Sequence, residues 1–323
     1  MPLDEILNLP DPWGLHHGDK LLGARIAFRL DGAANGPVIA ALGGISAHRL
    51  VAGAKGEAWW SEIVGPGLAL DTLRFRVLGI DYVGGTGDSS TSDGVHQFPP
   101  VSAYDQAAAL AEVVRHLGLK SLHAIVGASY GGMVALAFAE RFPALIERIV
   151  VLSAADRSQA LSTAWRCVQR QIVREALERG DGPSGLRLAR ALAMTTYRSA
   201  AEFAERFGSA PVRGPHRFRF PVEDYLFARG DRYIQKYRPE SFLTLSESID
   251  LFDIDAARVR TPATLLAVRQ DLLVPLADMR AFAGRLGGRY RLFEIDSLFG
   301  HDAFLKEGAA LKPILEQALT EAT

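Results

Sequence analysis

The chain has 323 residues and a mass of 35.0 kDa, which suits one large domain or a core domain with an insertion. Hydrophobic residues make up 48% and charged residues 23% of it, and the formal net charge is −1, so composition gives no indication of a nucleic-acid-binding or membrane-surface protein. The single cysteine excludes an internal disulfide and a cysteine-rich metal site. Because the N-terminal stretch lacks a signal-peptide pattern, we expect a cytoplasmic protein.

Short apolar segments that suit β-strands alternate along the chain with segments that suit helices. Residues 25–30 alternate apolar and polar side chains, as a half-exposed strand does. More evenly apolar runs, typical of buried parallel strands, follow at 38–44, 75–81, 122–128, 147–154, 263–268 and 290–295. Helical spacing of apolar residues precedes the run at 122–128 and follows it. This alternation predicts an α/β fold with a mostly parallel, doubly wound sheet covered by helices on both faces.

The strand pattern is interrupted between Ala154 and Pro262. Arg- and Ala-rich stretches with helical spacing replace it, and residues 156–240 contain 16 Lys+Arg against 10 Asp+Glu. We therefore predict a helical lid insertion at 155–261, set into a core formed by residues 1–154 and 262–323. The charge count makes the insertion basic within an otherwise acidic chain.

One serine stands in a glycine-rich turn between a predicted strand and a predicted helix. Residues 127–131, Gly-Ala-Ser-Tyr-Gly, fit the pattern G-x-S-x-G, in which a strained turn exposes the serine hydroxyl at the carboxyl edge of the sheet. The backbone amide of Tyr130 would begin the helix and can donate to an oxyanion. The alternative is a tight turn that merely needs a small residue. The strand before it and the helix after it favour Ser129 as a nucleophile.

A nucleophilic serine needs a base, and the base needs an acidic partner. In a fold with this turn the chain order is serine, acid, histidine. Asp271 follows the predicted strand at 263–268, and His301 follows the one at 290–295, so both belong to loops at the carboxyl edge of the sheet. The loop after residues 38–42 can supply a second oxyanion donor, the amide of Leu42 or Gly43.

Much of the chain resembles the homoserine O-acyltransferases of the α/β-hydrolase superfamily. The similar segments extend from about residue 24 to 305 and include "WWSEIVGPGLALDT", "VGASYGGMVAL", "TTYRS", "RQDLLVP" and "GHDAFL". The resemblance implies an α/β-hydrolase fold with Ser129 as nucleophile, Asp271 as the acid and His301 as the base. It also implies that Arg198 and Asp302 bind the substrate.

Two features favour a succinyl over an acetyl donor. The loop "LGGISAH", which contains Ile45 and Ser46, is similar to a shortened form of the loop in the succinyl-using branch of the family. Arg166 stands where the similar segment "AFNEVQRQ" has asparagine. An arginine there can pair with the distal carboxylate of a succinyl group, whereas an acetyl group would leave it unpaired. The alternative is that the arginines of the insertion lie on a solvated helix face. Trp59 and Trp60 are expected to anchor the core.

The resemblance implies an acyl-CoA-dependent O-acyltransferase that moves a succinyl group through an acyl-serine to L-homoserine, in methionine biosynthesis. Three alternatives stay open: a homoserine O-acetyltransferase, an L-serine O-acyltransferase, and an esterase or thioesterase with the same triad. Serine is only one methylene shorter than homoserine, and such a difference discriminates weakly. The intact triad argues against a non-catalytic binding protein. We expect no metal and no cofactor beyond the acyl-CoA co-substrate, no nucleic-acid or membrane partner, and a homodimer as the assembly.

Overall fold

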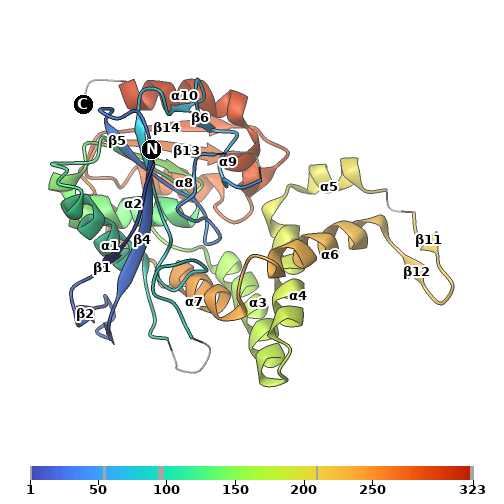
Figure 1. Ribbon diagram of the computed structural model, residues 1–323. Helices are drawn as coiled ribbons and strands as arrows, with labels where there is room; N and C mark the ends of the chain where they lie inside the picture. Colours follow the sequence, from blue (N-terminus) through green and yellow to red (C-terminus); the bar gives the residue numbers. More distant parts are fainter. Residues whose placement is uncertain (1, 54–55, 94–97, 209, 321–323) are drawn as a thin grey trace.

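The computed structural model describes residues 2–53, 56–93, 98–208 and 210–320 of the chain. Its centre is an eight-stranded sheet with the order β1-β4-β8-β5-β9-β10-β13-β14 (Figure 1). The strands of this sheet are β1 (Leu3–Asn8), β4 (Arg25–Gly32), β5 (Val38–Leu42), β8 (Arg76–Ile80), β9 (Ala124–Ala128), β10 (Ile149–Leu152), β13 (Ala263–Val268) and β14 (Tyr290–Ile295). The pairs β1–β4 and β4–β8 are antiparallel, and every pair from β8 to β14 is parallel. The predicted doubly wound α/β fold is confirmed.

Helices cover both faces of the sheet and divide the interior into two cores. One core lies beneath α1 (Ala103–His116), α2 (Tyr130–Arg141) and α8 (Leu276–Ala283), and the other beneath α9 (Ala303–Lys306) and α10 (Gly308–Thr320). On β5, Val38, Ala40 and Leu42 belong to the first core. Ile39 and Ala41, which alternate with them, belong to the second. A central parallel strand is thus buried on both sides, which is why its sequence is evenly apolar.

The N-terminal edge strand β1 was not predicted from the sequence. Its burial alternates as in any edge strand, with Leu3, Glu5 and Leu7 half-buried and the residues between them exposed. Glu5 on the inner side and Ile6 on the outer side break the apolar alternation. The sequence therefore lacks the period-two signal of a half-exposed strand.

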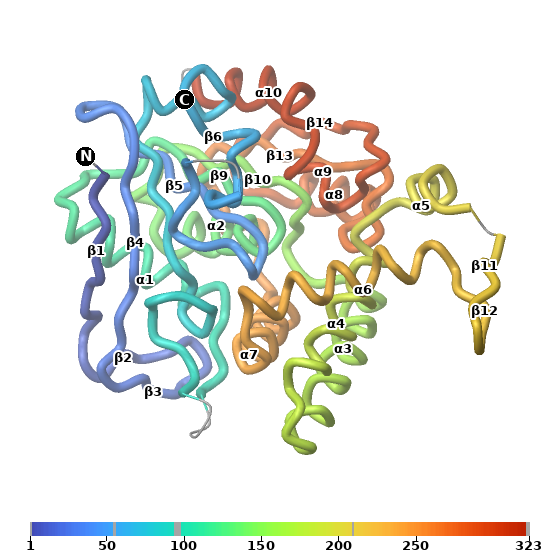
Figure 2. Tube along the Cα trace, turned by 45° about the vertical axis from the view of Figure 1, so that its right-hand side comes forward, coloured from blue at the N-terminus to red at the C-terminus, as the bar shows by residue number. Residues whose placement is uncertain are grey.

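The insertion between β10 and β13 is mainly helical, as predicted. Its helices are α3 (Ala160–Glu178), α4 (Gly182–Tyr197), α5 (Ala200–Arg206), α6 (Pro221–Ile234) and α7 (Pro239–Asp250). α4 packs against α3 and α6, while α5 and the two-residue strands β11 (Val212–Arg213) and β12 (Phe218–Arg219) project away from the sheet (Figures 1 and 2). This short hairpin was not predicted, because its polar/apolar alternation, Arg-Phe-Arg-Phe, covers only residues 217–220.

Short strand pairs and 3₁₀ turns complete the described chain. Two-residue strands form the pairs β2 (Trp13–Gly14) with β3 (Lys20–Leu21) and β6 (Val64–Gly65) with β7 (Leu70–Asp71). Turns of 3₁₀-helix lie at Pro143–Leu145, Ala256–Arg258 and Gly300–Asp302. Within the described ranges, no helix combines the length and apolar character needed to cross a bilayer.

Candidate active site

Ser129 occupies the sharp turn between β9 and α2. Its backbone angles are φ 55° and ψ −121°, a conformation that is strained for a residue with a side chain. A Cβ on Gly127 would lie 2.2 Å from the carbonyl oxygen of Gly131, and one on Gly131 would lie 2.3 Å from that of Leu42. The glycines are therefore required because three backbone segments pass close together, and this crowding holds the serine at the edge of the sheet.

The structure brings Ser129, His301 and Asp271 together in one hydrogen-bonded chain. His301 Nε2 lies 2.8 Å from Ser129 Oγ, and His301 Nδ1 lies 2.7 Å from Asp271 Oδ2. The other oxygen of Asp271 accepts hydrogen bonds from the amides of Leu273 and Val274 at 2.8 and 3.0 Å. Asp271 follows β13 and His301 lies in the 3₁₀ turn after β14, the positions expected from the sequence. This geometry is that of a serine nucleophile, its base and the acid that orients the base.

The environment of His301 suits a general base. Burial lowers the pKa of His301, but the adjacent Asp271 carboxylate and the nearby Asp302 raise it by more, so the net shift is upward. Asp271 accepts the Nδ1 proton of the neutral ring, which leaves Nε2 free to accept a proton from Ser129. The three residues can thus generate a serine alkoxide-like nucleophile at neutral pH.

The loop after β5 is fastened to the first turn of α2. The carbonyl oxygen of Gly43 accepts hydrogen bonds from the amide of Gly131 and the hydroxyl of Tyr82, each at 2.8 Å. This contact places the backbone of Leu42, Gly43 and Tyr130 around the Ser129 turn. That amides of these three residues stabilise an oxyanion stays a prediction.

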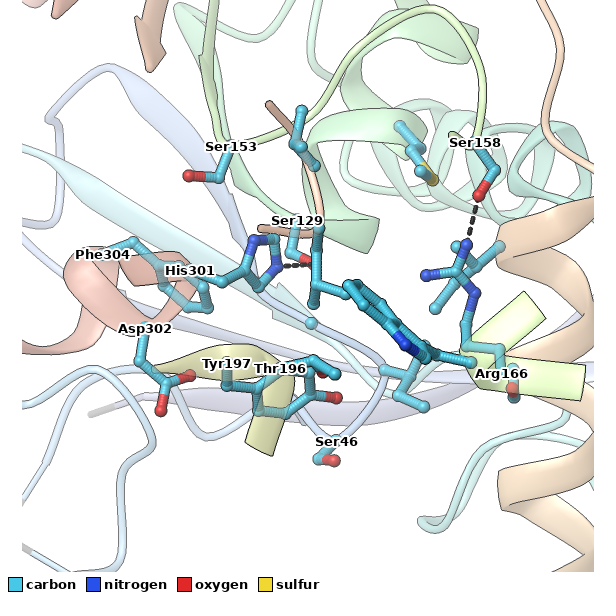
Figure 3. Close-up of a pocket in the computed structure, with 18 of the residues that line it drawn as sticks. Ser46, Ser129, Ser153, Ser158, Arg166, Thr196, Tyr197, His301, Asp302 and Phe304 are labelled. Atoms are coloured by element: carbon cyan, nitrogen blue, oxygen red, sulfur yellow. Dashed lines mark hydrogen bonds between the residues drawn. The ribbon is translucent and has the colours of Figure 1, made fainter. Parts of the chain in front are cut away.

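A cavity of about 210 Å³ opens beside the triad. Ser129 and His301 line it and are joined by a hydrogen bond (Figure 3). Four further residues singled out from the sequence also line it, namely Ile45, Ser46, Arg166 and Asp302. Asp302 and Arg166 lie on opposite sides of the Ser129–His301 pair (Figure 3).

Arg198 is buried against Asp302 and does not line this cavity. Its Nη2 lies 3.1 Å from Asp302 Oδ2, and its Nη1 lies 3.5 Å from Glu202 Oε1. Its guanidinium carbon also lies 5.2 Å from the centroid of the Phe299 ring. These contacts indicate that Arg198 holds Asp302 in place. A direct contact between Arg198 and a substrate stays a prediction.

Arg166 lines the cavity as a paired cation. Its Nε and Nη2 lie 3.0 and 2.7 Å from Asp250 Oδ1, and it also donates to Ser158. Asp250 pairs in addition with Arg170 Nη1 at 2.6 Å. The expectation that Arg166 would be unpaired without a succinyl group is therefore wrong, because a carboxylate from α7 neutralises it. Two guanidinium groups on one carboxylate still leave a net positive charge beside the cavity.

Several cavity residues were missed in the sequence. Trp59 packs half-buried against the second core, as expected, and it also lines the cavity, where it stacks on Trp60 with ring centroids 4.8 Å apart. Ser153 follows β10 at φ 49°, and its buried hydroxyl has no hydrogen-bond partner within the described residues. The position of Ser153 at the carboxyl end of a strand could have indicated that it lines the site. Arg190 and Tyr197 also line the cavity, and their helical segment gave no signal that separated them from its other polar residues.

Comparisons with known proteins agree with this geometry. A family profile described as the alpha/beta hydrolase fold matches residues 42–308. The chain is 40% identical to homoserine O-succinyltransferase of Xanthomonas campestris pv. campestris, over 97% of this chain and 82% of that protein. It is 33% identical to L-serine/homoserine O-acetyltransferase of Streptomyces lavendulae, over 94% of each. The crystal structure of homoserine O-acetyltransferase from Bacillus anthracis has the same fold, with a TM-score of 0.88 at 19% identity over 99% of this chain and 98% of that one.

Proposed function

The chain belongs to the homoserine/serine O-acyltransferase family of the α/β-hydrolase fold, and from this premise we propose that it transfers a succinyl group from succinyl-CoA to the hydroxyl of L-homoserine. The observation that carries the proposal is the hydrogen-bonded chain of Ser129, His301 and Asp271, whose serine and histidine line a cavity. The reaction would be an acylation in methionine biosynthesis.

In the first half-reaction Ser129 is acylated. His301 Nε2 takes the proton of the serine hydroxyl as Oγ attacks the thioester carbonyl of the acyl-CoA. Amides around the turn, those of Tyr130 and of Leu42 or Gly43, stabilise the negative charge on the carbonyl oxygen. The carbon–sulfur bond then breaks, His301 returns its proton to the sulfur, and coenzyme A leaves as the free thiol.

In the second half-reaction the acceptor replaces coenzyme A. Its hydroxyl gives a proton to His301 and attacks the carbonyl carbon of the acyl-serine. The bond from that carbon to Ser129 Oγ breaks, and His301 returns the proton to the serine. The products are the O-acyl amino acid and the original enzyme, so the two half-reactions use one triad in the same roles.

Two observations support succinyl as the acyl group. A homoserine O-succinyltransferase is 40% identical to the chain over nearly its whole length. Arg166 and Arg170 share the single carboxylate of Asp250, which leaves a positive charge for the distal carboxylate of a succinyl group. The similarity to an acetyltransferase supports acetyl as the alternative acyl group.

Asp302 supports an amino acid as the acceptor. It lines the cavity directly after His301 in the chain, and Arg198 fixes one of its oxygens. A carboxylate in that position can bind the ammonium group of homoserine or serine and bring the hydroxyl to His301. The similarity to an L-serine/homoserine acetyltransferase keeps serine as the second candidate acceptor.

A matrix of donors and acceptors tests this proposal. Purified enzyme is incubated with succinyl-CoA or acetyl-CoA and with homoserine, serine or no acceptor, while thiol release and product formation are both measured. We expect the highest kcat/KM with succinyl-CoA and homoserine, and little thiol release without an acceptor. A preference for acetyl-CoA or serine would overturn the corresponding half of the assignment. Rapid thiol release that no acceptor accelerates would identify a thioesterase instead.

A further inference from the structure

The loop that follows β5 contains two consecutive glycines, Gly43 and Gly44. A Cβ on Gly43 would lie 2.7 Å from the ring of Trp59 and 2.8 Å from the Cβ of Ala47, so close packing excludes a side chain there. A glycine backbone has wide conformational freedom, and two glycines in succession give the loop little preference of its own. A hydrogen-bond donor to an oxyanion must nevertheless be in place before the reaction begins. The loop therefore needs contacts from outside that hold it in one conformation.

Two donors hold the carbonyl oxygen of Gly43. One is the backbone amide of Gly131 and the other is the side-chain hydroxyl of Tyr82, each at 2.8 Å. The Gly131 amide belongs to the turn that carries Ser129, so it ties the loop to the nucleophile. The Tyr82 hydroxyl comes from the segment after β8. Because it is a side-chain group, its contribution can be removed by substitution.

Tyr82 is itself held firmly. Its residue surface is only 2% exposed, and its ring lies nearly perpendicular to that of Tyr130 with the centroids 5.1 Å apart. The backbone of the next residue, Val83, forms two hydrogen bonds with the side-chain amide of the buried Gln106, at 2.9 and 2.8 Å. Burial raises the pKa of Tyr82, so the hydroxyl stays protonated and donates. Tyr82 thus presents one fixed donor to the loop.

The second tyrosine of this pair lies behind the other predicted oxyanion donor. Tyr130 follows Ser129, and its amide at the start of α2 is that donor. Its ring is buried, and its hydroxyl lies 2.6 Å from Ser248 Oγ on α7. The Tyr130 amide and the glycine loop are therefore each supported by a phenol ring, and the two rings are in contact.

We propose that Tyr82 is a positioning residue for the oxyanion site and holds the Gly43 loop where its amide can reach the tetrahedral intermediate on Ser129. Tyr82 does not line the cavity, so it acts through the carbonyl group of Gly43 and not by touching the substrate. The inference rests on the proposed function only in taking Ser129 as the residue that is acylated. It requires no particular donor or acceptor, and it holds for acyl transfer and hydrolysis alike.

Tyr82→Phe tests the assignment because it removes one oxygen atom and one hydrogen bond. The variant should fold, since the Gly131 amide still donates to Gly43 and the ring contact with Tyr130 is kept. One neutral hydrogen bond can bias the loop by no more than its own free energy, so kcat should fall by roughly 2- to 10-fold. The loss should be equal for succinyl-CoA and acetyl-CoA, while KM stays unchanged. The midpoint of the pH–rate profile should also stay unchanged, because His301 keeps its contacts.

A mimic of the tetrahedral intermediate provides a readout that a purely structural role would not move. Ser129 Oγ can add to the carbonyl carbon of an alkyl trifluoromethyl ketone, its proton passes to His301, and the negative charge stays on the ketone oxygen. The inhibition constant of this ketone should rise in Tyr82→Phe by the same factor by which kcat falls, because both depend on the oxyanion site.

Tyr104→Phe is the matched control. The hydroxyl of Tyr104 on α1 donates to Glu140 on α2, so this variant also loses a hydrogen bond from a tyrosine but leaves the Gly43 loop untouched. It should change neither kcat nor the inhibition constant of the ketone. Thermal unfolding curves of both variants show how much each hydroxyl contributes to stability alone.

Two results would overturn the inference. If kcat and the inhibition constant in Tyr82→Phe equal those of the wild type, even with a lower unfolding temperature, Tyr82 serves the fold only. If KM rises while kcat is unchanged, Tyr82 acts on substrate binding instead. The proposed function is judged by a different outcome, thiol release that no acceptor accelerates. In that case the enzyme would be a thioesterase, and Tyr82→Phe should slow its thiol release by the same factor.

Discussion

The sheet and the helical insertion supply different parts of the site. The sheet supplies Ser129, Asp271 and His301 from three loops at one edge, and these groups satisfy one another in a closed chain of hydrogen bonds. The insertion supplies Arg166 and Arg190, which line the cavity and give it positive charge. We propose that the sheet carries the reaction and that the insertion contributes to the choice of substrate. Asp302 links the two units, because it follows His301 in the core and pairs with Arg198 of the insertion.

This division makes a general prediction about substitutions. Changes in the triad should slow the transfer of any acyl group to any acceptor, because every substrate passes through the same nucleophile. Changes in the insertion should alter the ranking of donors or acceptors and leave part of the reaction intact. A substitution that fails to follow this rule would show that the two units are not separate.

Ser129→Ala should have the largest effect. Loss of the nucleophile is expected to lower kcat by ~10⁶-fold for every donor and acceptor. The protein should still fold, because the hydroxyl faces the cavity and its removal leaves no hole in either core. Steady-state assays and a thermal unfolding curve measure both effects. Residual transfer near the wild-type rate would exclude Ser129 as the nucleophile.

Asp271→Asn should follow, with a loss of ~10⁴-fold in kcat and a shift in pH dependence. Only neutral His301 can accept the serine proton, so acylation should rise with pH through the raised pKa of His301, above its ordinary value of 6.5. Asp271→Asn removes the charge that raises this pKa and leaves the burial that lowers it. The midpoint of the residual pH–rate profile should therefore move to lower pH. An unchanged midpoint would contradict the assigned role of Asp271.

Arg198→Ala should affect mainly the second half-reaction. Without Arg198, Asp302 loses the ion pair that fixes it, and breaking a buried pair typically costs enough to lower a rate by about 30-fold or more. Acylation of Ser129 by donor alone should survive, while transfer to homoserine collapses. Rapid-quench measurement of the acyl-enzyme separates the two steps. Equal losses in both would mean that Arg198 supports the whole site.

Arg166→Met should have the smallest effect and one limited to the donor. It removes one of the two guanidinium groups on Asp250, so the distal carboxylate of a succinyl group loses its cation. We expect kcat/KM for succinyl-CoA to fall roughly 10- to 100-fold more than that for acetyl-CoA. Glu247→Gln, on the same helix as Asp250 but outside the cavity lining, is a matched control that should change neither. Equal effects on both donors would remove Arg166 from donor recognition.

The same division explains what the sequence could predict. The parallel strands and the order of Ser129, Asp271 and His301 were predictable, because the carboxyl ends of parallel strands meet at one edge of a sheet. The pairing of Arg166 with Asp250 was not, because it depends on how α3 and α7 pack across 84 residues of chain. Arg190 was missed for a related reason, since its guanidinium lies against the rings of Tyr197 and Tyr233, and the second of these contacts depends on how α4 and α6 pack. Charge alone could not show which arginines pair with a carboxylate.

The most direct test of the account is a search for an acyl group on Ser129. Wild-type enzyme is mixed with succinyl-CoA in the absence of an acceptor, quenched rapidly and digested, and the peptide containing Ser129 is examined by mass spectrometry. The account predicts a succinyl adduct on Ser129 that homoserine removes at the rate of turnover and that Ser129→Ala cannot form. A peptide without an adduct, together with kinetics that require both substrates to bind before any product leaves, would contradict it.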